Sequence, residues 1–385
     1  MATLHCTGDR NRRAEAARVP TRAWASGLAR AVVPAAVLGA ALILAGCGSR
    51  GSTAPDADDP APPPPVRLPE GAHQRWPQAA GDVLGRSERL LIYLPRSGDQ
   101  QEAIAQRFLG DASRHWQIAE ANGTPKAEAG QPLIVPLRPL NPTGVRTSDL
   151  QTVPILCYHR FGGTGSRMVV SPNGFAAQLD WLARNQYTVL RLSQLSDFLA
   201  GKQALPARSV IITIDDGYES VYRHAYPLLK KHGFPATLFV YTDFVGIGDG
   251  LNWAQLQEMA GSGLIDIQAH SKTHRNLTER NPGETDERYR AAIETELRAP
   301  RELLEKRLSA AQVQVRQFAY PFGDANEVVL DTMARQQYQI GVTVNPGGNA
   351  FFAHPLMLRR TMIFGDTDLE GFKARLQTSR SVGTP

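Results

Sequence analysis

Short apolar runs alternate with amphipathic stretches from residue 151 onward. The apolar runs have the length of buried strands, and the stretches between them repeat their apolar residues at helical spacing. Strands are predicted at Val153–Tyr158, Ser209–Ile214, Ala236–Tyr241, Ile265–Gln268, Val315–Tyr320 and Gln339–Val344. Helices are predicted, among other places, at Gly174–Asn185, Ser220–His232, Trp253–Ala260 and Glu284–Leu308. This alternation predicts an α/β fold with a mainly parallel sheet or barrel covered by helices, in which the chemistry gathers at the carboxyl ends of the strands.

A smaller pattern occupies residues 89–136. The run RLLIYLP predicts a strand, and Ser97-Gly98-Asp99 predicts a turn that caps a helix. Apolar residues at helical spacing follow Ile104 and again follow Trp116, and a short strand is predicted at Leu133–Pro136. The order strand, helix, helix, strand indicates a separate βααβ unit.

The first 46 residues form a basic leader that runs into an uncharged apolar stretch. Six arginines stand against two acidic residues, and Ala31–Gly46 reads AVVPAAVLGAALILAG. This stretch is short for a membrane-spanning helix and is typical of a signal peptide. It ends in Leu44-Ala45-Gly46-Cys47, which resembles the lipobox of bacterial lipoproteins. The resemblance implies a lipid on Cys47 and an extracytoplasmic, membrane-anchored protein, in the outer membrane or facing the periplasm. A plain signal peptide or an N-terminal membrane anchor is the alternative.

The net charge and the cysteine content argue against nucleic-acid binding and against an internal disulfide. The formal net charge is +5, and because most of it lies in the leader, the rest of the chain carries about +1. Such a chain offers no electrostatic case for binding nucleic acid. The three cysteines are Cys6, Cys47 and Cys157, so processing at Cys47 leaves Cys157 alone and excludes an internal disulfide. Cys157 lies in an apolar run and is predicted to be a buried strand residue rather than a nucleophile.

The most informative motif lies at the end of the strand predicted at 209–214. It reads SVIITIDDGY, so a buried strand delivers Asp215 and Asp216 to its carboxyl end and Gly217 turns the chain. Successive strand residues point in opposite directions, so the two acids are expected to do different work. If both are ionised, they repel each other unless a cation lies between them. By itself the motif is equally compatible with an ordinary Asp-Gly turn.

Two further strand ends carry residues that bear chemistry. After one strand the chain reads AHSKTH, and His270 and His274 reach the same point if the chain makes one helical turn. One carboxylate with two imidazoles leaves positions for water and substrate, which is the layout of a catalytic metal. After another strand the chain reads QFAYPFGD, and its Pro-Phe-Gly turn can aim backbone N–H groups at a developing oxyanion. Taken separately, surface or capping histidines and a structural turn would explain these motifs.

Together and in this order, the motifs resemble those of the NodB-type polysaccharide deacetylases of carbohydrate esterase family 4, over residues 151–377. The resemblance implies a distorted (β/α) barrel that hydrolyses N-acetyl groups of a glycan. It implies metal binding by Asp216, His270 and His274, general-base catalysis by Asp215, and oxyanion stabilisation by the backbone amide of Phe322. Zinc is the expected metal, although Ni2+, Co2+ or Fe2+ would also suit such ligands.

The sequence departs from the common pattern of that family at an arginine. Many members carry it two residues before the motif proline, where this chain has Ala319. Either Arg359 or Arg360 is the candidate to replace it as the partner of Asp215.

The late Leu-x-His motif that usually supplies the acid is not evident either. Early in the domain, Pro154–His159 reads PILCYH, which resembles the Tyr-His element of the poly-N-acetylglucosamine deacetylases. That resemblance implies that His159 is the general acid, with His354 near the C-terminus as its rival.

The small unit at 89–136 resembles the LysM carbohydrate-binding module through the stretches SGD, IAQRF, W-x-IAEANG and GQPLIVP. LysM modules bind N-acetylglucosamine polymers such as peptidoglycan or chitin, and a spacer without a working site is the alternative. The expected layout is a signal peptide at 1–46, a Pro-rich linker at 47–88, a LysM-like module at 89–136, a hinge at 137–150 and a deacetylase domain at 151–377.

We therefore expect a monomeric deacetylase whose partner is an N-acetylated glycan. The LysM-like unit favours peptidoglycan, whereas the Tyr-His element favours an exopolysaccharide of the poly-N-acetylglucosamine type. A non-catalytic, glycan-binding lipoprotein with a degenerate deacetylase domain is the alternative. A glycosidase is disfavoured. Its two carboxylates lie about 5–9 Å apart on opposite sides of the scissile bond, which adjacent Asp215 and Asp216 fit badly, and the histidine pair would have no role.

Overall fold

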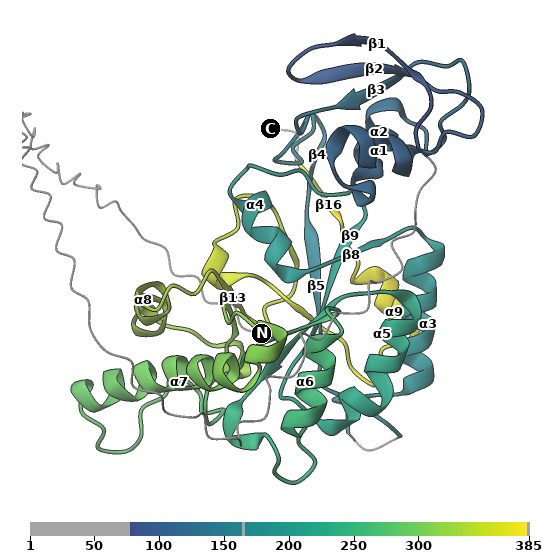
Figure 1. Cartoon of the computed structure of the whole chain (residues 1–385). Helices are drawn as coiled ribbons and strands as arrows, with labels where there is room; N and C mark the ends of the chain where they lie inside the picture. Colours follow the sequence, from purple (N-terminus) through teal and green to yellow (C-terminus); the bar gives the residue numbers. More distant parts are fainter. Residues whose placement is uncertain (1–77, 164–165, 383–385) are drawn as a thin grey trace, which may run out of the picture. The chain divides into compact units, whose positions relative to one another are not determined.

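The computed structural model describes residues 78–163 and 166–382, and Figure 1 draws their helices and strands. The predicted signal peptide at 1–46, the predicted lipidation site Cys47 and most of the predicted linker at 47–88 lie outside the described residues. Among the helices of the described part, none combines the length and the apolarity that crossing a bilayer requires.

A curled, mainly parallel sheet forms the centre of the domain predicted at 151–377. Its strands are β5 (Val153–Tyr158), β8 (Thr188–Leu190), β9 (Ser209–Ile214), β10 (Ala236–Val240), β11 (Ile265–Ala269), β12 (Gln317–Ala319), β13 (Ile340–Val342), β14 (Gly348–Asn349) and β15 (Thr361–Met362). The order is β13-β12-β11-β10-β9-β5-β14, with β8 beside β9 and β15 beside β5. The six neighbouring strands from β13 to β5 all run in parallel, so their carboxyl ends meet at one edge of the sheet.

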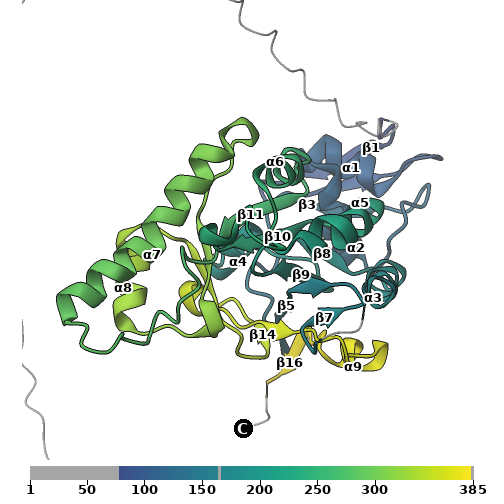
Figure 2. The same ribbon diagram turned by 90° about the horizontal axis from the view of Figure 1, so that it is seen from below.

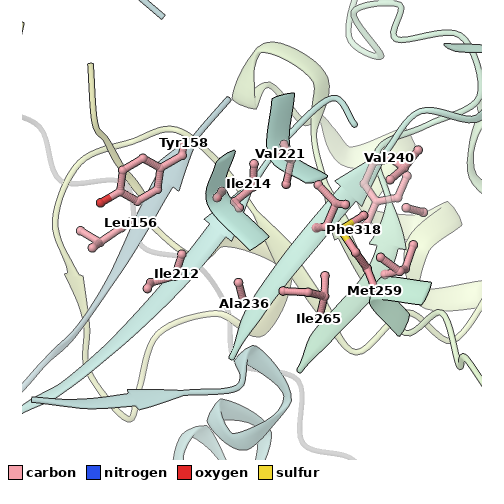
Figure 3. Close-up of a cluster of buried hydrophobic side chains, with 14 of the residues drawn as sticks. Leu156, Tyr158, Ile212, Ile214, Val221, Ala236, Val240, Met259, Ile265 and Phe318 are labelled. Atoms are coloured by element: carbon pink, nitrogen blue, oxygen red, sulfur yellow. The ribbon is translucent and has the colours of Figure 1, made fainter. Parts of the chain in front are cut away.

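The central strands are buried on both faces. Every residue of β5, β9 and β10 is buried, because helices cover one face and the inside of the curl covers the other. Figure 3 shows part of the cluster on the helix side, which includes Leu156 and Ile212. The alternate residues Ile155 and Ile211 pack in a second cluster inside the curl. Residue parity along a strand therefore decides which way a side chain faces.

A short segment near the C-terminus bridges the two edges of the curl. Leu358 forms a parallel bridge with Val342 at the end of β13, and β15 pairs with β5 at Leu156 and Cys157. The buried side chain of Arg360, between those two contacts, lies inside the curl. The α/β fold predicted from the sequence is confirmed, in the form of a half-barrel sheet that this segment bridges.

Helices lie outside the strands, as Figure 2 shows for α3 (Pro172–Arg184), α5 (Tyr226–His232), α6 (Trp253–Gly261) and α7 (Asp286–Arg307). The remaining helices of this domain are α4 (Leu195–Leu199), α8 (Glu327–Arg335) and α9 (Leu369–Ala374). Ser171 caps α3 by accepting the N–H of Gly174, and Thr285 caps α7 by accepting that of Arg288. These caps explain why both helices begin close to their predicted starts.

Three predicted elements differ in detail. The helix predicted at 220–232 begins with a π-helical turn, Val221–Ala225, before α5. The strands predicted at 315–320 and 339–344 shorten to β12 and β13, because the curl leaves few residues in register; β12 pairs with β11 at a single position. Two minor pairs complete the domain: β4 (Asp149–Gln151) with β16 (Ser379–Ser381), and β6 (Arg160–Phe161) with β7 (Val169–Val170).

The unit predicted at 89–136 contains one strand more than expected. It comprises β1 (Asp82–Arg86), β2 (Leu90–Leu94), α1 (Gln101–Leu109), α2 (His115–Asn122) and β3 (Leu133–Pro136), with the antiparallel order β1-β2-β3. Strand β1 lies in the segment assigned to the linker at 47–88, and that assignment is wrong for these five residues. All of them are exposed, so no apolar pattern reveals the strand.

The predicted cap of the first helix in this unit is also wrong. Gln100 stands at the N-cap of α1 and makes no side-chain capping bond. Asp99 instead accepts the Tyr93 hydroxyl at 2.8 Å and the N–H groups of Ala80, Gly81 and Arg96. Its carboxylate therefore ties the start of the unit to the turn after β2. Glycan binding by this unit stays a prediction.

Candidate active site

Asp215 and Asp216 follow β9, and the alternation of side chains separates them. Asp215 continues the inward-facing series of Ile211 and Thr213 and is 2% exposed, whereas Asp216 is 8% exposed. Asp216 has a φ of 75°, and Gly217 follows with a φ of 86°. This left-handed pair bends the chain sharply, so that the Asp216 side chain faces the loop after β11.

Asp216 lies between the two histidines of that loop. Its Oδ1 is 3.4 Å from Nε2 of His270 and 3.3 Å from Nε2 of His274. The three ligand atoms lie within 4.8 Å of one another, so they surround one point, as the sequence predicts. A carboxylate oxygen with two imidazole nitrogens is a donor set that suits zinc and similar divalent cations. The residues therefore fit a single metal ion.

Backbone contacts orient His270 for this purpose. Its Nδ1 donates to the carbonyl oxygen of Ala319 at 2.7 Å, which leaves Nε2 directed at Asp216. Such a bond fixes the tautomer and the ring plane of a metal-ligating histidine. Burial lowers the pKa of His270, but the carboxylates of Asp216 and Asp215 outweigh it and raise that pKa above its ordinary value. The site therefore attracts positive charge.

The chain between the two histidines is not the helical turn that the sequence predicted. Ser271 and His274 have positive φ angles of 71° and 64°, and the N–H of His274 donates to Oγ of Ser271 at 2.9 Å. Two left-handed residues reverse the chain within a tight loop, and this brings the second ring back beside the first. The ring centroids of His270 and His274 are 4.8 Å apart.

Glu296 of α7 holds this loop, and the sequence analysis missed it. One carboxylate oxygen accepts the N–H groups of Lys272 and Thr273, each at 2.9 Å, and the other accepts the Thr273 hydroxyl at 2.8 Å. Glu296 is 5% exposed. A signal was present: Glu296 falls in the buried stripe of α7 between Ile293 and Pro300, where a carboxylate needs a partner.

Arg360 is the partner of Asp215. Its two terminal nitrogens each donate to one carboxylate oxygen at 2.7 Å, so the pair is bidentate. Nη1 also donates to Oγ1 of Thr213, and Nε donates to the carbonyl oxygen of Thr343. Arg360 is fully buried, whereas Arg359 is exposed. The structure thus selects Arg360 from the two candidates.

This ion pair decides the charge of Asp215. Burial raises the pKa of a carboxyl group, but the Arg360 guanidinium overcomes that effect and holds the pKa of Asp215 below its ordinary value. Cys157 lies on the other side, with Sγ 3.5 Å from Oδ2 of Asp215. Burial raises the pKa of this thiol well above its ordinary value. The prediction that Cys157 is a buried strand residue is confirmed, and its thiol stays protonated.

Of the two candidate acids, the structure brings only His159 to the site. His159 directly follows β5, and its ring lies within 4.8 Å of ligand atoms of Cys157 and Asp215. Burial lowers the pKa of His159, against the opposing effect of Asp215 and Asp216.

His354 lies elsewhere. It caps a short turn by accepting the N–H of Leu356, and it lines a cavity of about 510 Å³ together with Thr152 and Arg380. Thr152 precedes β5, so this cavity is at the amino end of the strands. His354 follows β14, which pairs with the amino end of β5 at Val153 and Pro154. The chain reaches the carboxyl half of β5, next to the site, only later, at β15.

The turn after β12 presents the backbone of Phe322. Phe322 and Gly323 have positive φ angles of 62° and 82°, and Gly323 donates its N–H to the carbonyl oxygen of Tyr320 at 2.8 Å. Within the described residues, the N–H of Phe322 has no acceptor. The Phe322 ring lies 5.1 Å from that of His274. The turn that carries this amide therefore lies next to the candidate metal ligand His274, where the sequence predicts an oxyanion donor.

Left-handed backbone concentrates in these loops. In the described part of the chain, seven non-glycine residues have positive φ, and four of them belong to the site: Asp216, Ser271, His274 and Phe322. Each such residue costs roughly 1–3 kcal/mol, so the surrounding structure must hold it in place. No residue type in the sequence announces this strain, which is why the helical turn was predicted instead.

This chain resembles known proteins in sequence and in structure. The family described as polysaccharide deacetylase matches residues 202–341. The chain is 32% identical over 203 residues to the putative polysaccharide deacetylase YxkH of Bacillus subtilis, which covers 53% of this chain and 68% of that protein. It is 29% identical over 199 residues to the poly-beta-1,6-N-acetyl-D-glucosamine N-deacetylase of Staphylococcus aureus strain MRSA252, which covers 49% of this chain and 67% of that protein.

Solved structures resemble the same region. IcaB from Ammonifex degensii superposes with a TM-score of 0.51 at 30% identity, over 59% of this chain and 97% of that one. The Streptococcus pyogenes deacetylase PplD, solved in complex with acetate, superposes with a TM-score of 0.52 at 26% identity, over 58% of this chain and 98% of that one. The protein therefore belongs to the polysaccharide deacetylases of carbohydrate esterase family 4 and is a hydrolase that acts on N-acetyl amides.

Proposed function

We propose that this protein removes acetyl groups from an N-acetylglucosamine polysaccharide with a divalent metal bound by Asp216, His270 and His274. The observation that carries the proposal is the pair of adjacent carboxylates with separate partners. Asp216 faces two imidazole nitrogens at 3.3–3.4 Å, while Asp215 is held by Arg360 beside them. A metal held there would polarise the acetamide carbonyl and lower the pKa of a water molecule.

Asp215 is the general base. Its pKa below the ordinary value keeps it ionised at neutral pH, so it can accept a proton from the attacking water. The bidentate bonds from Arg360 fix the carboxylate in one orientation. Water adds to the acetyl carbon as its proton passes to Asp215, and the charge that develops on the carbonyl oxygen meets the N–H of Phe322.

His159 is the general acid. Collapse of the tetrahedral intermediate breaks the carbon–nitrogen bond, and the amine leaves readily only if it receives a proton. The ring of His159 lies beside Asp215 and close enough to both carboxylates for them to act on its pKa. His159 therefore donates that proton, and acetate and a free amine on the sugar are the products.

Two glycans remain candidates for the substrate. Likeness to the Staphylococcus aureus enzyme supports a poly-N-acetylglucosamine exopolysaccharide. The LysM-like unit at 82–136 supports peptidoglycan. The same unit, together with a lipid on Cys47, would keep a monomeric enzyme at the cell envelope and raise the effective concentration of glycan at its site. Zinc is the metal that we expect in this site.

Acetate release tests the proposal. The zinc-loaded protein is incubated with purified peptidoglycan and with poly-β-1,6-N-acetylglucosamine, and Asp215→Asn is measured beside the wild type. We expect release from one of the two glycans and a loss of roughly 100-fold or more in the variant, as for the removal of a general base. Bound metal without acetate release from any glycan would favour a non-catalytic, glycan-binding protein. Equal release by the two proteins would remove Asp215 from its role.

A further inference from the structure

Both histidines of the candidate metal site belong to one short segment, residues 270–274, which we call the histidine loop. The turn after β10 holds two carbonyl groups of this loop. Thr242 donates its N–H to the carbonyl oxygen of Ser271 at 3.3 Å. Asp243 donates its N–H to the carbonyl oxygen of Lys272 at 3.0 Å. These bonds tie the loop to the neighbouring strand end, but they do not involve the N–H groups in the middle of the loop.

Those N–H groups depend on the carboxylate of Glu296. One of its oxygens accepts the N–H groups of Lys272 and Thr273, and the other accepts the Thr273 hydroxyl. The ammonium group of Lys272 does not compete for this carboxylate, because it lies 2.7 Å from Asp243 instead. Glu296 therefore serves the loop as a hydrogen-bond acceptor with three bonds, and bonds to a charged acceptor are stronger than neutral ones.

Helix α7 gives Glu296 a fixed position. Ile293 and Leu297, on the same buried stripe of the helix, are fully buried in the main core cluster of the domain. Glu296 therefore extends from a packed helix and not from another loop. A side chain on a rigid element holds its partner more precisely than one on a loop.

His274 is the ligand that depends most on this support. A bond to a backbone carbonyl fixes the ring of His270, whereas Nδ1 of His274 has no hydrogen-bond partner in the described part of the chain. The backbone of the loop must therefore place the His274 ring. That backbone is left-handed at Ser271 and at His274, a conformation that is costly for residues other than glycine. A loop released from Glu296 would relax and carry His274 out of place.

We propose that Glu296 is a positioning residue that holds the histidine loop in its metal-ligating conformation before the ion arrives. This proposal rests on the proposed function, because it concerns the same metal site. Glu296 is not one of the three ligand residues, so it acts through the loop. A loop that is already ordered loses less conformational entropy when the metal binds. Glu296 therefore raises the affinity of the site for metal.

Three substitutions of Glu296 separate its hydrogen bonds from its charge. Glu296→Met has a side chain of similar length without acceptor oxygens. Glu296→Gln loses the charge but keeps one oxygen for the two N–H groups, and its amide nitrogen can donate to the hydroxyl oxygen of Thr273. Glu296→Asp keeps the charge but is one methylene group too short to reach the loop well, and it decides the question if Glu296→Met does not fold.

The matched control is Glu305→Met on the same helix. Glu305 also accepts a backbone N–H, that of Val315 at 3.0 Å, but it does so before the amino end of β12, away from the metal ligands. Zinc affinity of the metal-free full chain is measured by competition with a chromophoric chelator. Thermal unfolding of the metal-free proteins measures stability, and acetate release is followed at limiting and at saturating zinc.

We expect Glu296→Met to bind zinc roughly 10- to 100-fold more weakly, the range found for groups that orient a metal ligand, and Glu296→Asp about tenfold more weakly. Glu296→Gln should stay within about threefold of the wild type, since its bonds are weaker but remain. Acetate release by Glu296→Met should recover as the zinc concentration rises. Glu305→Met should bind zinc as the wild type does, even if it unfolds at a lower temperature.

Wild-type zinc affinity in Glu296→Met and Glu296→Asp would overturn the proposal. An equal loss in Glu296→Gln and Glu296→Met would also overturn it, because the charge would then matter and not the hydrogen bonds. A similar loss in Glu305→Met would trace the effect to general stability instead of positioning. Zinc binding that depends on Glu296 in a protein that releases no acetate would support the positioning role and reject the proposed function.

Discussion

Asp215 and Asp216 are neighbours in the chain, yet their surroundings differ in kind. Asp215 faces inward to a guanidinium that satisfies both of its oxygens at 2.7 Å. Asp216 faces two imidazoles whose nitrogens are 3.3–3.4 Å away, around a point that suits a cation. The charge of Asp215 is therefore already balanced by a side chain of the protein. The charge of Asp216 is left to be balanced by a bound cation.

The difference teaches how one dipeptide acquires two roles. Strand parity sends Asp215 into the curl, where the segment that bridges the sheet edges delivers Arg360. A left-handed residue and Gly217 then turn Asp216 toward the loop after β11. Partners from two distant parts of the chain, rather than the acids themselves, decide which carboxylate is the base and which is the metal ligand.

The most direct test of these two roles neutralises each acid in turn. Asp216→Asn should abolish tight metal binding and lower kcat/KM by more than about 1000-fold, because both the metal and the charge that holds it are lost. Asp215→Asn should keep the metal while it loses turnover. Metal content by plasma mass spectrometry and acetate release measure the two effects, with the exposed Asp366→Asn as control. Normal metal content in Asp216→Asn would contradict the assignment.

A second comparison sets the two candidate acids against each other. His159→Gln should lower kcat about 100-fold, as for the loss of a general acid, and should remove the decline of activity at high pH. Burial lowers the pKa of His159, so that decline should set in below the pH expected for an ordinary histidine. His354→Gln, at the other end of the strands, should leave the pH profile as it is. A reversed result would make His354 the acid.

A third variant, Arg360→Gln, tests the buried ion pair between Arg360 and Asp215. The largest influence that opposes burial is then gone, and only His270 and His159 still lower the pKa of Asp215. That pKa should therefore rise, and the low-pH limb of kcat/KM should shift to higher pH. In the wild type, the ion pair contributes stability above the ordinary pKa of Asp215, and that contribution disappears as the pH falls through the lowered pKa. The variant should therefore lose about 3–5 kcal/mol of unfolding free energy near pH 7 and progressively less under acid conditions.

Denaturant unfolding at several pH values measures the stability of Arg360→Gln, and a pH series of kcat/KM measures the shift. Arg359→Gln changes the neighbouring exposed arginine. This control should change neither the free energy of unfolding nor the low-pH limb of kcat/KM. An unchanged low-pH limb in Arg360→Gln would show that Asp215 does not depend on the guanidinium for its charge.

Much of the fold was accessible from the sequence because it rests on short-range patterns. The runs that became β5 and β9 were predicted with their observed bounds, since parallel strands buried on both faces consist mostly of apolar residues. The acids and the histidines were found because they stand at strand ends, where the geometry of a parallel sheet brings side chains together. Strand β1 was missed because its residues are all exposed and carry no pattern.

The amino-acid pattern was enough to identify the residues that carry chemistry and to predict that parallel strands bring them to one edge of the sheet. The partners of these residues became known from the folded chain: Arg360 rather than Arg359 beside Asp215, His159 rather than His354 near it, and Glu296 behind the histidine loop. The physical reason is that apolar periodicity is a local property, which one strand or helix reveals alone. The ion pair of Asp215, the left-handed turns and the hydrogen bonds of Glu296 depend on residues far apart in the chain. They form only once the sheet has curled and brought its edges together.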